Sequence, residues 1–285
     1  MASSAITAHP IHTLRRLFTA LEAAVAATLA DPNPKAVHRL RTTTRRIEAQ
    51  LELLSLLPDL PEHARPKAKT QKLLKQLRRA AGRVRDLDVQ LKLTQSKSPR
   101  LHQELHQLES SFKRQRGEES KRLLRILRRH QEKLSRRFKT LLEALAPAET
   151  LGLPISRLTQ LILRWYLHQT PTTANSSSQL HTIRKAAKLA RYMAESASPT
   201  AKSPRTPAAR LALIFESLQQ SGGIWHDWLT LSRIARRELG PSSSLSQSFA
   251  SNCQESLASY RRDLKFQPKT LSIALPNSKK AASKR

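Results

Sequence analysis

The sequence predicts an all-α protein that contains an internal duplication. Segments between prolines repeatedly place apolar residues three and four positions apart, which is the spacing of an amphipathic helix. Two landmarks also recur in the same order. His38 and Asp86 lie 48 positions apart, and His181 and Asp227 lie 46 positions apart. We therefore predict two copies of one helical module of about 140 residues, with four helices in each half.

The first landmark is a histidine followed by cations three and seven positions later, a spacing that puts all three on one helix face. It occurs as His38, Arg41 and Arg45 in the first half and as His181, Arg184 and Lys188 in the second. The second landmark is a leucine, a glycine and an aspartate at intervals of five and four positions. It occurs as Leu77, Gly82 and Asp86 and again as Leu218, Gly223 and Asp227. We interpret Asp86 as an ion-pair partner that positions arginines, not as a catalytic group.

Prolines divide the first half into four expected helices. Proline provides no amide hydrogen and disfavours helix in the residue before it, so Pro32 and Pro34 end the first helix, and Pro58 and Pro61 end the second. Apolar periodicity sets the remaining limits. The expected helices cover residues 11–30, 37–57, 62–93 and 101–145, the last with a break near Gly117.

In the second half, polar loops at residues 170–178 and 196–207 flank the helix that carries the second histidine motif. Residues 147–154 are expected to connect the halves. The other expected helices cover residues 155–168, then 211–220 and 224–239 on either side of Gly222 and Gly223, and finally 242–266. The predicted organisation is a flexible stretch at 1–10, one domain at 11–266 with halves at approximately 11–146 and 155–266, and a basic disordered tail at 267–285.

The net charge predicts a polyanionic partner. The 285 residues include 51 Lys and Arg against 21 Asp and Glu, which gives a formal charge of +30. Such a surplus repels itself in the compact state and calls for nucleic acid, an anionic membrane or inorganic polyphosphate.

The single cysteine, Cys253, excludes an intramolecular disulfide and favours a reducing, cytoplasmic location. No apolar run approaches the roughly 18 residues of a membrane span, and we recognise no signal peptide.

Cations also form rows on two further expected helices. The rows consist of Lys72, Lys75, Arg79 and Arg83 on the third helix and of Arg122, Arg125, Arg129, Lys133 and Arg136 on the fourth. Beside the histidine motifs lie three more candidate ligands, Arg46, Lys185 and Arg191. Like charges at neighbouring helix positions destabilise a helix by about a few tenths of a kcal/mol per pair. We therefore expect these rows to bind an anion.

The histidine motif, the stretch at residues 82–88 and the degenerate second copy resemble the CHAD family, the conserved-histidine α-helical domains, over about residues 12–266. The resemblance implies two four-helix bundles related by a pseudo-twofold axis. It also implies a basic groove or pore that binds inorganic polyphosphate through the two histidine motifs, and attachment to polyphosphate granules. Arg46 and the third-helix row have no cationic counterparts in the second copy. We therefore expect the first half to carry more of the binding.

The main alternative is a helical protein that binds nucleic acid without sequence preference. Aromatic residues make up 4% of the chain and none lies within the basic rows, which disfavours base stacking. An enzyme of the triphosphate-tunnel type would need an alternating Glu-x-Glu-x-Lys strand and metal-binding carboxylates, and the sequence contains neither. Phosphate-binding loops and nucleophile elbows are absent too. We therefore predict a non-catalytic polyphosphate-binding protein without cofactor, metal site or membrane association.

Overall fold

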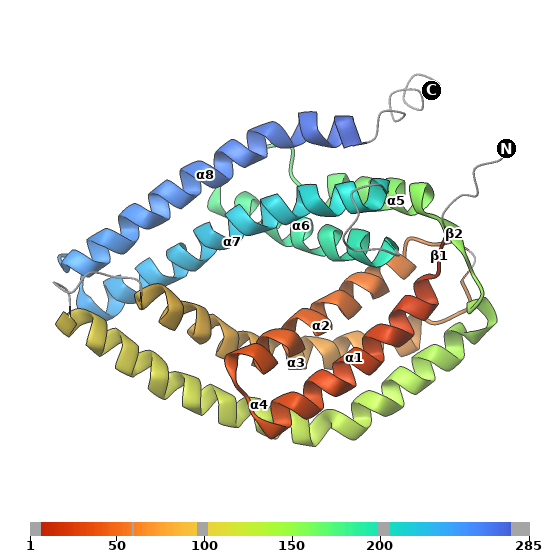
Figure 1. Cartoon of the computed structure of the whole chain (residues 1–285), viewed down its shortest axis with the longest axis horizontal. Helices are drawn as coiled ribbons and strands as arrows, with labels where there is room; N and C mark the ends of the chain where they lie inside the picture. The colour runs from red at the N-terminus through yellow and green to blue at the C-terminus, as the bar shows by residue number, and fades with distance from the viewer. Residues whose placement is uncertain (1–6, 59, 96–101, 199–205, 275–285) are drawn as a thin grey trace.

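The structure of the protein, a computed structural model, consists mostly of long helices (Figure 1). It describes residues 7–58, 60–95, 102–198 and 206–274, and side chains as far as residue 266. The helices of these ranges are α1 (Pro10–Ala30), α2 (Pro34–Leu54), α3 (Ala64–Thr94), α4 (His102–Leu145), α5 (Ile155–Gln169), α6 (Ser177–Ala197), α7 (Pro207–Leu239) and α8 (Ser244–Ala274). A short 3₁₀ helix follows α4 at Ala146–Ala148, and β1 (Thr7–Ala8) pairs antiparallel with β2 (Leu153–Pro154).

Side-chain caps lie at the starts of several helices where the sequence has Asn, Ser or Thr, among them α2, α6 and α7. The side-chain oxygen of Asn33 accepts a hydrogen bond of 2.9 Å from a first-turn amide of α2. Ser176 and Gln179 form a reciprocal capping box at the start of α6, and Thr206 caps α7. Each cap satisfies an amide that has no partner within the helix, which stabilises the helix by about 1 kcal/mol. These caps fix where α2, α6 and α7 begin.

Two expected helix breaks are wrong. α4 continues through Gly117, and α7 continues through Gly222 and Gly223. A glycine inside a helix costs about 1 kcal/mol relative to alanine, which is less than a long helix gains by burying apolar side chains along its length. The last helix also passes its predicted end, because α8 continues through 267–274.

At both ends of the domain, regular structure extends beyond the predicted limits. Pro10 already begins α1, and Thr7 and Ala8 pair with β2, so this part of the predicted flexible stretch has regular structure. Residues 267–274, which the sequence assigned to a disordered tail, are helical. The rest of both predictions, at 1–6 and 275–285, lies outside the described residues.

The first four helices form a bundle in which α1 packs on α2 and α4, α2 packs on α3, and α3 packs on α4. In the second half, α5 packs on α6 and α7, α6 packs on α7, and α7 packs on α8. This arrangement confirms the predicted all-α class. The relation of two bundles by a pseudo-twofold axis stays a prediction. Within the described ranges, no helix is both long enough and apolar enough to cross a membrane.

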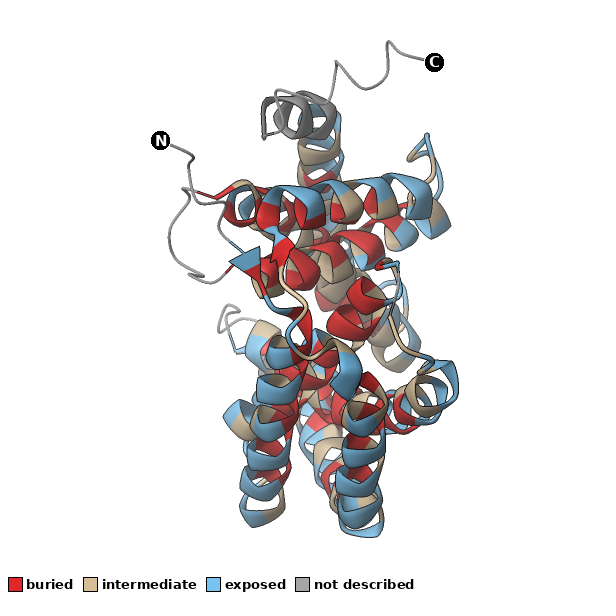
Figure 2. Cartoon of the chain, turned by 90° about the vertical axis from the view of Figure 1, so that its right-hand side faces the viewer, coloured by how far each residue is buried: buried red, intermediate tan, exposed pale blue. Residues whose placement is uncertain are grey.

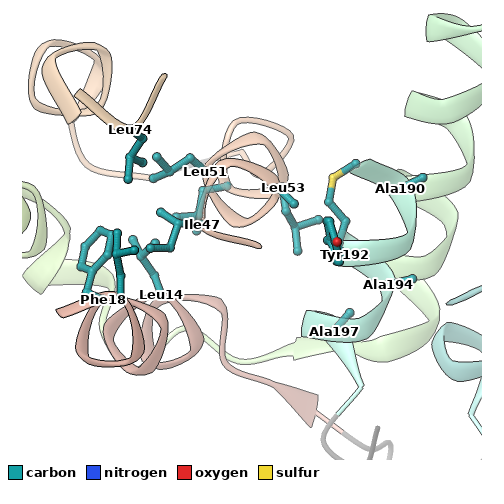
Figure 3. Close-up of a cluster of buried hydrophobic side chains, with 14 of the residues drawn as sticks. Leu14, Phe18, Ile47, Leu51, Leu53, Leu74, Ala190, Tyr192, Ala194 and Ala197 are labelled. Atoms are coloured by element: carbon teal, nitrogen blue, oxygen red, sulfur yellow. The ribbon is translucent and has the colours of Figure 1, made fainter. Parts of the chain in front are cut away.

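One hydrophobic core runs through both halves, so they are not separate globules. Figure 2 shows buried residues on the faces that the helices turn toward one another. In the first half, Phe18 of α1 stacks on Phe138 of α4 with ring centroids 3.7 Å apart. Between the halves, Leu53 of α2 lies beside Tyr192 of α6, and both are buried (Figure 3). The two helices that carry the histidine motifs are therefore packed directly on each other.

A second apolar cluster joins the halves where α3 and α4 meet α7 and α8, at the left of Figure 1. It contains Leu87, Leu108, Phe112, Leu231 and Phe249. The halves therefore contact each other both through α2 and α6 and through this cluster. Two contacts of this kind hold the facing surfaces of α2, α3, α6 and α7 in a fixed relation.

Candidate anion-binding cavity

A basic cavity of about 490 Å³ lies among α2, α3, α6 and α7, where the two halves face each other. We call it the central cavity. Its charged and histidine lining residues within the described ranges are His38, Arg41, Arg45, Arg46, Arg85, Asp86, Arg184, Lys188, Arg191, His226 and Asp227. Arginine and lysine therefore outnumber the carboxylates that share this space, and the cavity is a concentrated region of positive charge.

The fold directs both histidine motifs toward the central cavity because the other faces of their helices are apolar. Val37 and Leu40 on α2 and Ala187 and Ala190 on α6 are completely buried in the core. A helix with one apolar stripe in the core presents its polar stripe away from that core. Since α2 and α6 pack on each other, their polar stripes meet at the same opening.

Ion pairs hold several cations at the edge of the central cavity. Arg191 of α6 pairs with Glu195 at 2.7 Å, and Arg46 of α2 reaches the same carboxylate at 3.2 Å. The shared carboxylate therefore links the two motif helices. Arg41 pairs with Asp86 of α3 at 3.6 Å. This contact confirms the interpretation of Asp86 as an ion-pair partner that positions an arginine.

Arg184 and Lys188, which also line the central cavity, are less well neutralised than the cations at its edge. Within the described ranges, neither Arg184 nor Lys188 has a carboxylate oxygen within 4.0 Å. The Nε atoms of Arg45 and Arg184 are buried and have no hydrogen-bond partner among the described residues. A buried donor without a partner costs about 1–3 kcal/mol, and more for a charged group. An anion in the central cavity would accept hydrogen bonds from these donors and offset their charge.

The crowding of cations shifts the pKa values of groups in the central cavity. Burial, followed by repulsion from Arg41, Arg45 and Arg184, lowers the pKa of Lys188 to about 7. Burial raises the pKa of Asp227 to about 6, although Arg184 opposes this shift. Both shifts express the cost of placing a charge in a partly desolvated site. The ligand-free cavity therefore carries less charge at neutral pH than its sequence implies.

The histidines of the site favour the neutral form. Burial, then repulsion from Arg85, Lys188 and Arg41, lowers the pKa of His38. Burial, then repulsion from Arg184 and from His181, lowers the pKa of His226 to about 4. A neutral imidazole can donate one hydrogen bond and accept another. An anion bound beside either histidine would favour its protonated form.

The family of the chain follows from its sequence match. The CHAD domain model matches residues 12–236, which is most of the 285 residues. The chain belongs to the CHAD domain family. The match ends before α8, whereas the predicted extent of the resemblance reached residue 266.

Two solved structures share the CHAD fold of this chain. The crystal structure of the CHAD domain from the plant Ricinus communis is similar with a TM-score of 0.66 and 17% identity, covering 97% of this chain and 94% of that one. PptA from Streptomyces chartreusis is similar with a TM-score of 0.53 and 15% identity, covering 94% of this chain and 98% of that one. No curated protein matches the chain in sequence.

The central cavity of this CHAD domain contains most of the residues that the histidine motifs predicted. These are His38, Arg41, Arg45, Arg46, Arg184, Lys188 and Arg191. His181 and Lys185 lie on α6 but do not line the cavity. The ring of His181 instead lies beside that of His226, with centroids 5.1 Å apart. The second motif therefore reaches the cavity through Arg184 and Lys188, and through its neighbour His226.

The predicted rows on α3 and α4 lie outside the central cavity. Lys72, Arg129 and Lys133 line a second cavity, while the remaining members line neither: Lys75, Arg79, Arg83, Arg122, Arg125 and Arg136. Position along the helix explains this for Lys72, which precedes Arg85 by 13 residues, or about 20 Å along α3. Arg83 and Arg122 instead pair with Glu119, each at 2.6 Å. These rows do not line the central cavity, and their binding of an anion stays a prediction.

Two lining residues that the sequence analysis did not select are Arg85 and His226. Each directly precedes a landmark aspartate, Asp86 or Asp227, and all four residues line the central cavity. The position directly before each landmark aspartate was therefore the sequence signal that could have identified both residues.

Glycines bring the arginines close to the helices that face them. At Gly82 on α3, an added Cβ atom would collide with the guanidinium of Arg41. In the second half, an added Cβ at Gly222 would lie 3.1 Å from Cγ of Arg184, whereas Gly223 has no neighbour within 4 Å. The landmark spacing paired Gly82 with Gly223, but the close approach to the second arginine occurs at Gly222.

We expect Gly82→Ala to weaken polyanion binding without lowering the stability of the fold. Alanine favours a helix over glycine by about 1 kcal/mol, but its Cβ would displace the Arg41 guanidinium. Because one charge-assisted hydrogen bond is lost, we expect a polyanion to bind about tenfold more weakly. The melting temperature should not fall. Gly117→Ala on α4 is the matched control, since nothing lies within 4 Å of the added Cβ. Unchanged affinity in Gly82→Ala would show that the position of Arg41 is unimportant.

Proposed function

We propose that this CHAD domain binds inorganic polyphosphate in the central cavity without hydrolysing it. The observation that carries the proposal is the incomplete neutralisation of buried cations that line the central cavity. Among the described residues, the Nε atoms of Arg45 and Arg184 are buried donors without an acceptor, and Lys188 lies among arginines with no carboxylate oxygen within 4.0 Å. A fold that concentrates unsatisfied cations in one cavity is less costly when an anion occupies it.

The residue types suit a linear phosphate chain. Guanidinium groups bind phosphate oxygens through paired hydrogen bonds, and a lysine adds a mobile point charge. Arg41, Arg184 and Lys188 come from both halves, so successive phosphates could be bound from both sides of the central cavity. A chain of phosphates carries no base to be recognised, and dense cations are then sufficient. A cytoplasmic location and retention on polyphosphate granules belong to the same proposal.

Binding of nucleic acid is the less favoured alternative because the central cavity offers little for base stacking. Its one aromatic lining residue outside the histidines, within the described ranges, is Tyr192. That ring is buried, and the guanidinium groups of Arg46 and Arg191 lie over it at 5.8 and 5.9 Å from its centroid. Stacking on an aromatic ring supplies about 1–3 kcal/mol per base in proteins that bind single strands. A nucleic acid would therefore bind in this cavity mainly through its sugar–phosphate backbone.

A competition experiment tests the proposed ligand. Labelled long-chain polyphosphate is bound to the protein at a fixed salt concentration of about 0.15 M, because electrostatic affinity depends on salt. Unlabelled polyphosphate is then compared with duplex DNA, single-stranded RNA and pyrophosphate, at equal phosphate concentration. We expect polyphosphate to displace the label at least about tenfold more effectively than either nucleic acid. Equal displacement by DNA would assign the cavity to polyanions in general.

A further inference from the structure

A second basic cavity, of about 470 Å³, lies between α3 and α4 in the first half. We call it the α3–α4 cavity. Its lining residues within the described ranges are Lys69, Lys72, Leu73, Gln76, Arg129, His130, Lys133 and Arg137. The cations come from the N-terminal part of α3 and the C-terminal part of α4, which pack along each other. No carboxylate is among these lining residues.

The cations of the α3–α4 cavity have no ion-pair partners within the described ranges. Arg129, Lys133 and Arg137 also follow one another at four-residue intervals, so like charges stack on one face of α4. Such pairs destabilise a helix by about a few tenths of a kcal/mol each. Elsewhere on the same helices, Arg83 and Arg122 share the carboxylate of Glu119. The fold thus neutralises these two cations of α3 and α4 but, within the described ranges, leaves those of the α3–α4 cavity without an ion-pair partner.

A histidine adds a second, independent feature. The Nδ1 atom of His130 is buried and has no hydrogen-bond partner among the described residues. Burial, followed by repulsion from Arg129 and Lys133, lowers the pKa of His130. A buried polar atom without a partner is rare in proteins and calls for an acceptor or donor that binds there. An anion beside Arg129 and Lys133 would reverse the repulsion and favour a protonated His130.

The α3–α4 cavity is separate from the central cavity. Lys72 lies about 20 Å along α3 from Arg85, which lines the central cavity. The two cavities therefore lie at different positions along α3, and they share no lining residue. One small phosphate oligomer cannot contact both.

We propose that the α3–α4 cavity is a second binding site for short runs of linked phosphates, independent of the central cavity. Its described lining residues offer guanidinium, ammonium and imidazole groups, and among them Leu73 is the one large apolar side chain and His130 the one aromatic ring. This chemistry fits an all-phosphate ligand and gives a nucleobase nothing to stack on. The inference goes beyond the proposed function and shares with it the class of ligand.

The number of bound tripolyphosphate molecules per chain tests this inference. Calorimetric titration at about 0.15 M salt is expected to give two sites in the unmodified protein. Lys72→Gln combined with Arg129→Gln and Arg137→Gln should leave one site. The matched control is Lys75→Gln combined with Arg79→Gln and Arg125→Gln. It removes one lysine and two arginines from the same two helices outside both cavities, so it should keep two sites.

A fourth protein distinguishes the two proposals. Arg184→Gln combined with Lys188→Gln removes cations from the central cavity, and it should also leave one site. If the proposed function fails and this inference holds, the unmodified protein has one site, which the α3–α4 variant loses and the central variant keeps. The inference is overturned if the α3–α4 variant binds as many molecules as the unmodified protein, or if the control loses as much as that variant. Circular dichroism and melting curves are measured on all four proteins, and removing like charges should not lower their stability.

Discussion

Reversing the charges of Arg41, Arg184 and Lys188 together is expected to weaken polyphosphate binding at least about 100-fold at 0.15 M salt, roughly the loss of two or three phosphate contacts. The three side chains line the central cavity from α2 and α6. Each Glu removes a cation and places a carboxylate where a phosphate would bind. The slope of log affinity against log salt should also become shallower, because fewer counterions are released. Fluorescence titration with labelled polyphosphate at several salt concentrations measures both effects.

The matched control is Lys75→Glu combined with Arg79→Glu and Arg125→Glu. These exposed residues line neither cavity, and the control changes the net charge by the same amount. We expect it to weaken binding about tenfold at most, through the long-range field alone. Equal losses in the two triple variants, with equal changes in salt slope, would mean that diffuse net charge binds the polymer. The central cavity would then have no special part in binding.

Most of the fold could be predicted because its signals are local. Prolines and apolar periodicity placed the expected helix 11–30 within one residue of α1, and the expected helix 155–168 within one residue of α5. The errors lie where tertiary packing outweighs a local preference. Gly222 does not break α7, because its backbone packs against the Tyr260 ring at a place where a side chain would not fit. Neither the partner nor the distance is visible in a sequence.

The candidate site could be predicted in part. The histidine motifs predicted cations of α2 and α6 that line one cavity, because helical spacing determines which residues share a face. Spacing does not determine where along its length a helix meets another helix. The row that begins at Lys72 therefore lies outside the cavity that the motifs share, and Arg85, farther along α3, was missed. That the first half carries more of the binding stays a prediction, and cations of both halves line the central cavity.

Affinity for polyphosphate is expected to fall as the pH rises from about 7 to 9, by up to about tenfold per pH unit. In the ligand-free protein, burial and the neighbouring arginines lower the pKa of Lys188 to about 7, so Lys188 is largely neutral above that pH. A bound polyanion favours the ammonium form and raises this pKa again. Binding therefore takes up a proton, and uptake of a proton makes affinity decrease with increasing pH. Asp227, with a pKa of about 6, adds a change of the same sign mainly at lower pH.

Lys188→Arg isolates this contribution because a guanidinium stays charged throughout the range. The variant should bind with a nearly flat pH profile between 7 and 9, and at pH 9 it should bind more tightly than the unmodified protein. Calorimetry in two buffers with different ionisation enthalpies should detect proton uptake on binding in the unmodified protein and little in the variant. Lys75→Arg, at an exposed position on α3 outside both cavities, is the control and should keep the original profile. If Lys188→Arg kept the original slope, the proton would belong to another group, and Lys188 would not be the cation that responds to the ligand.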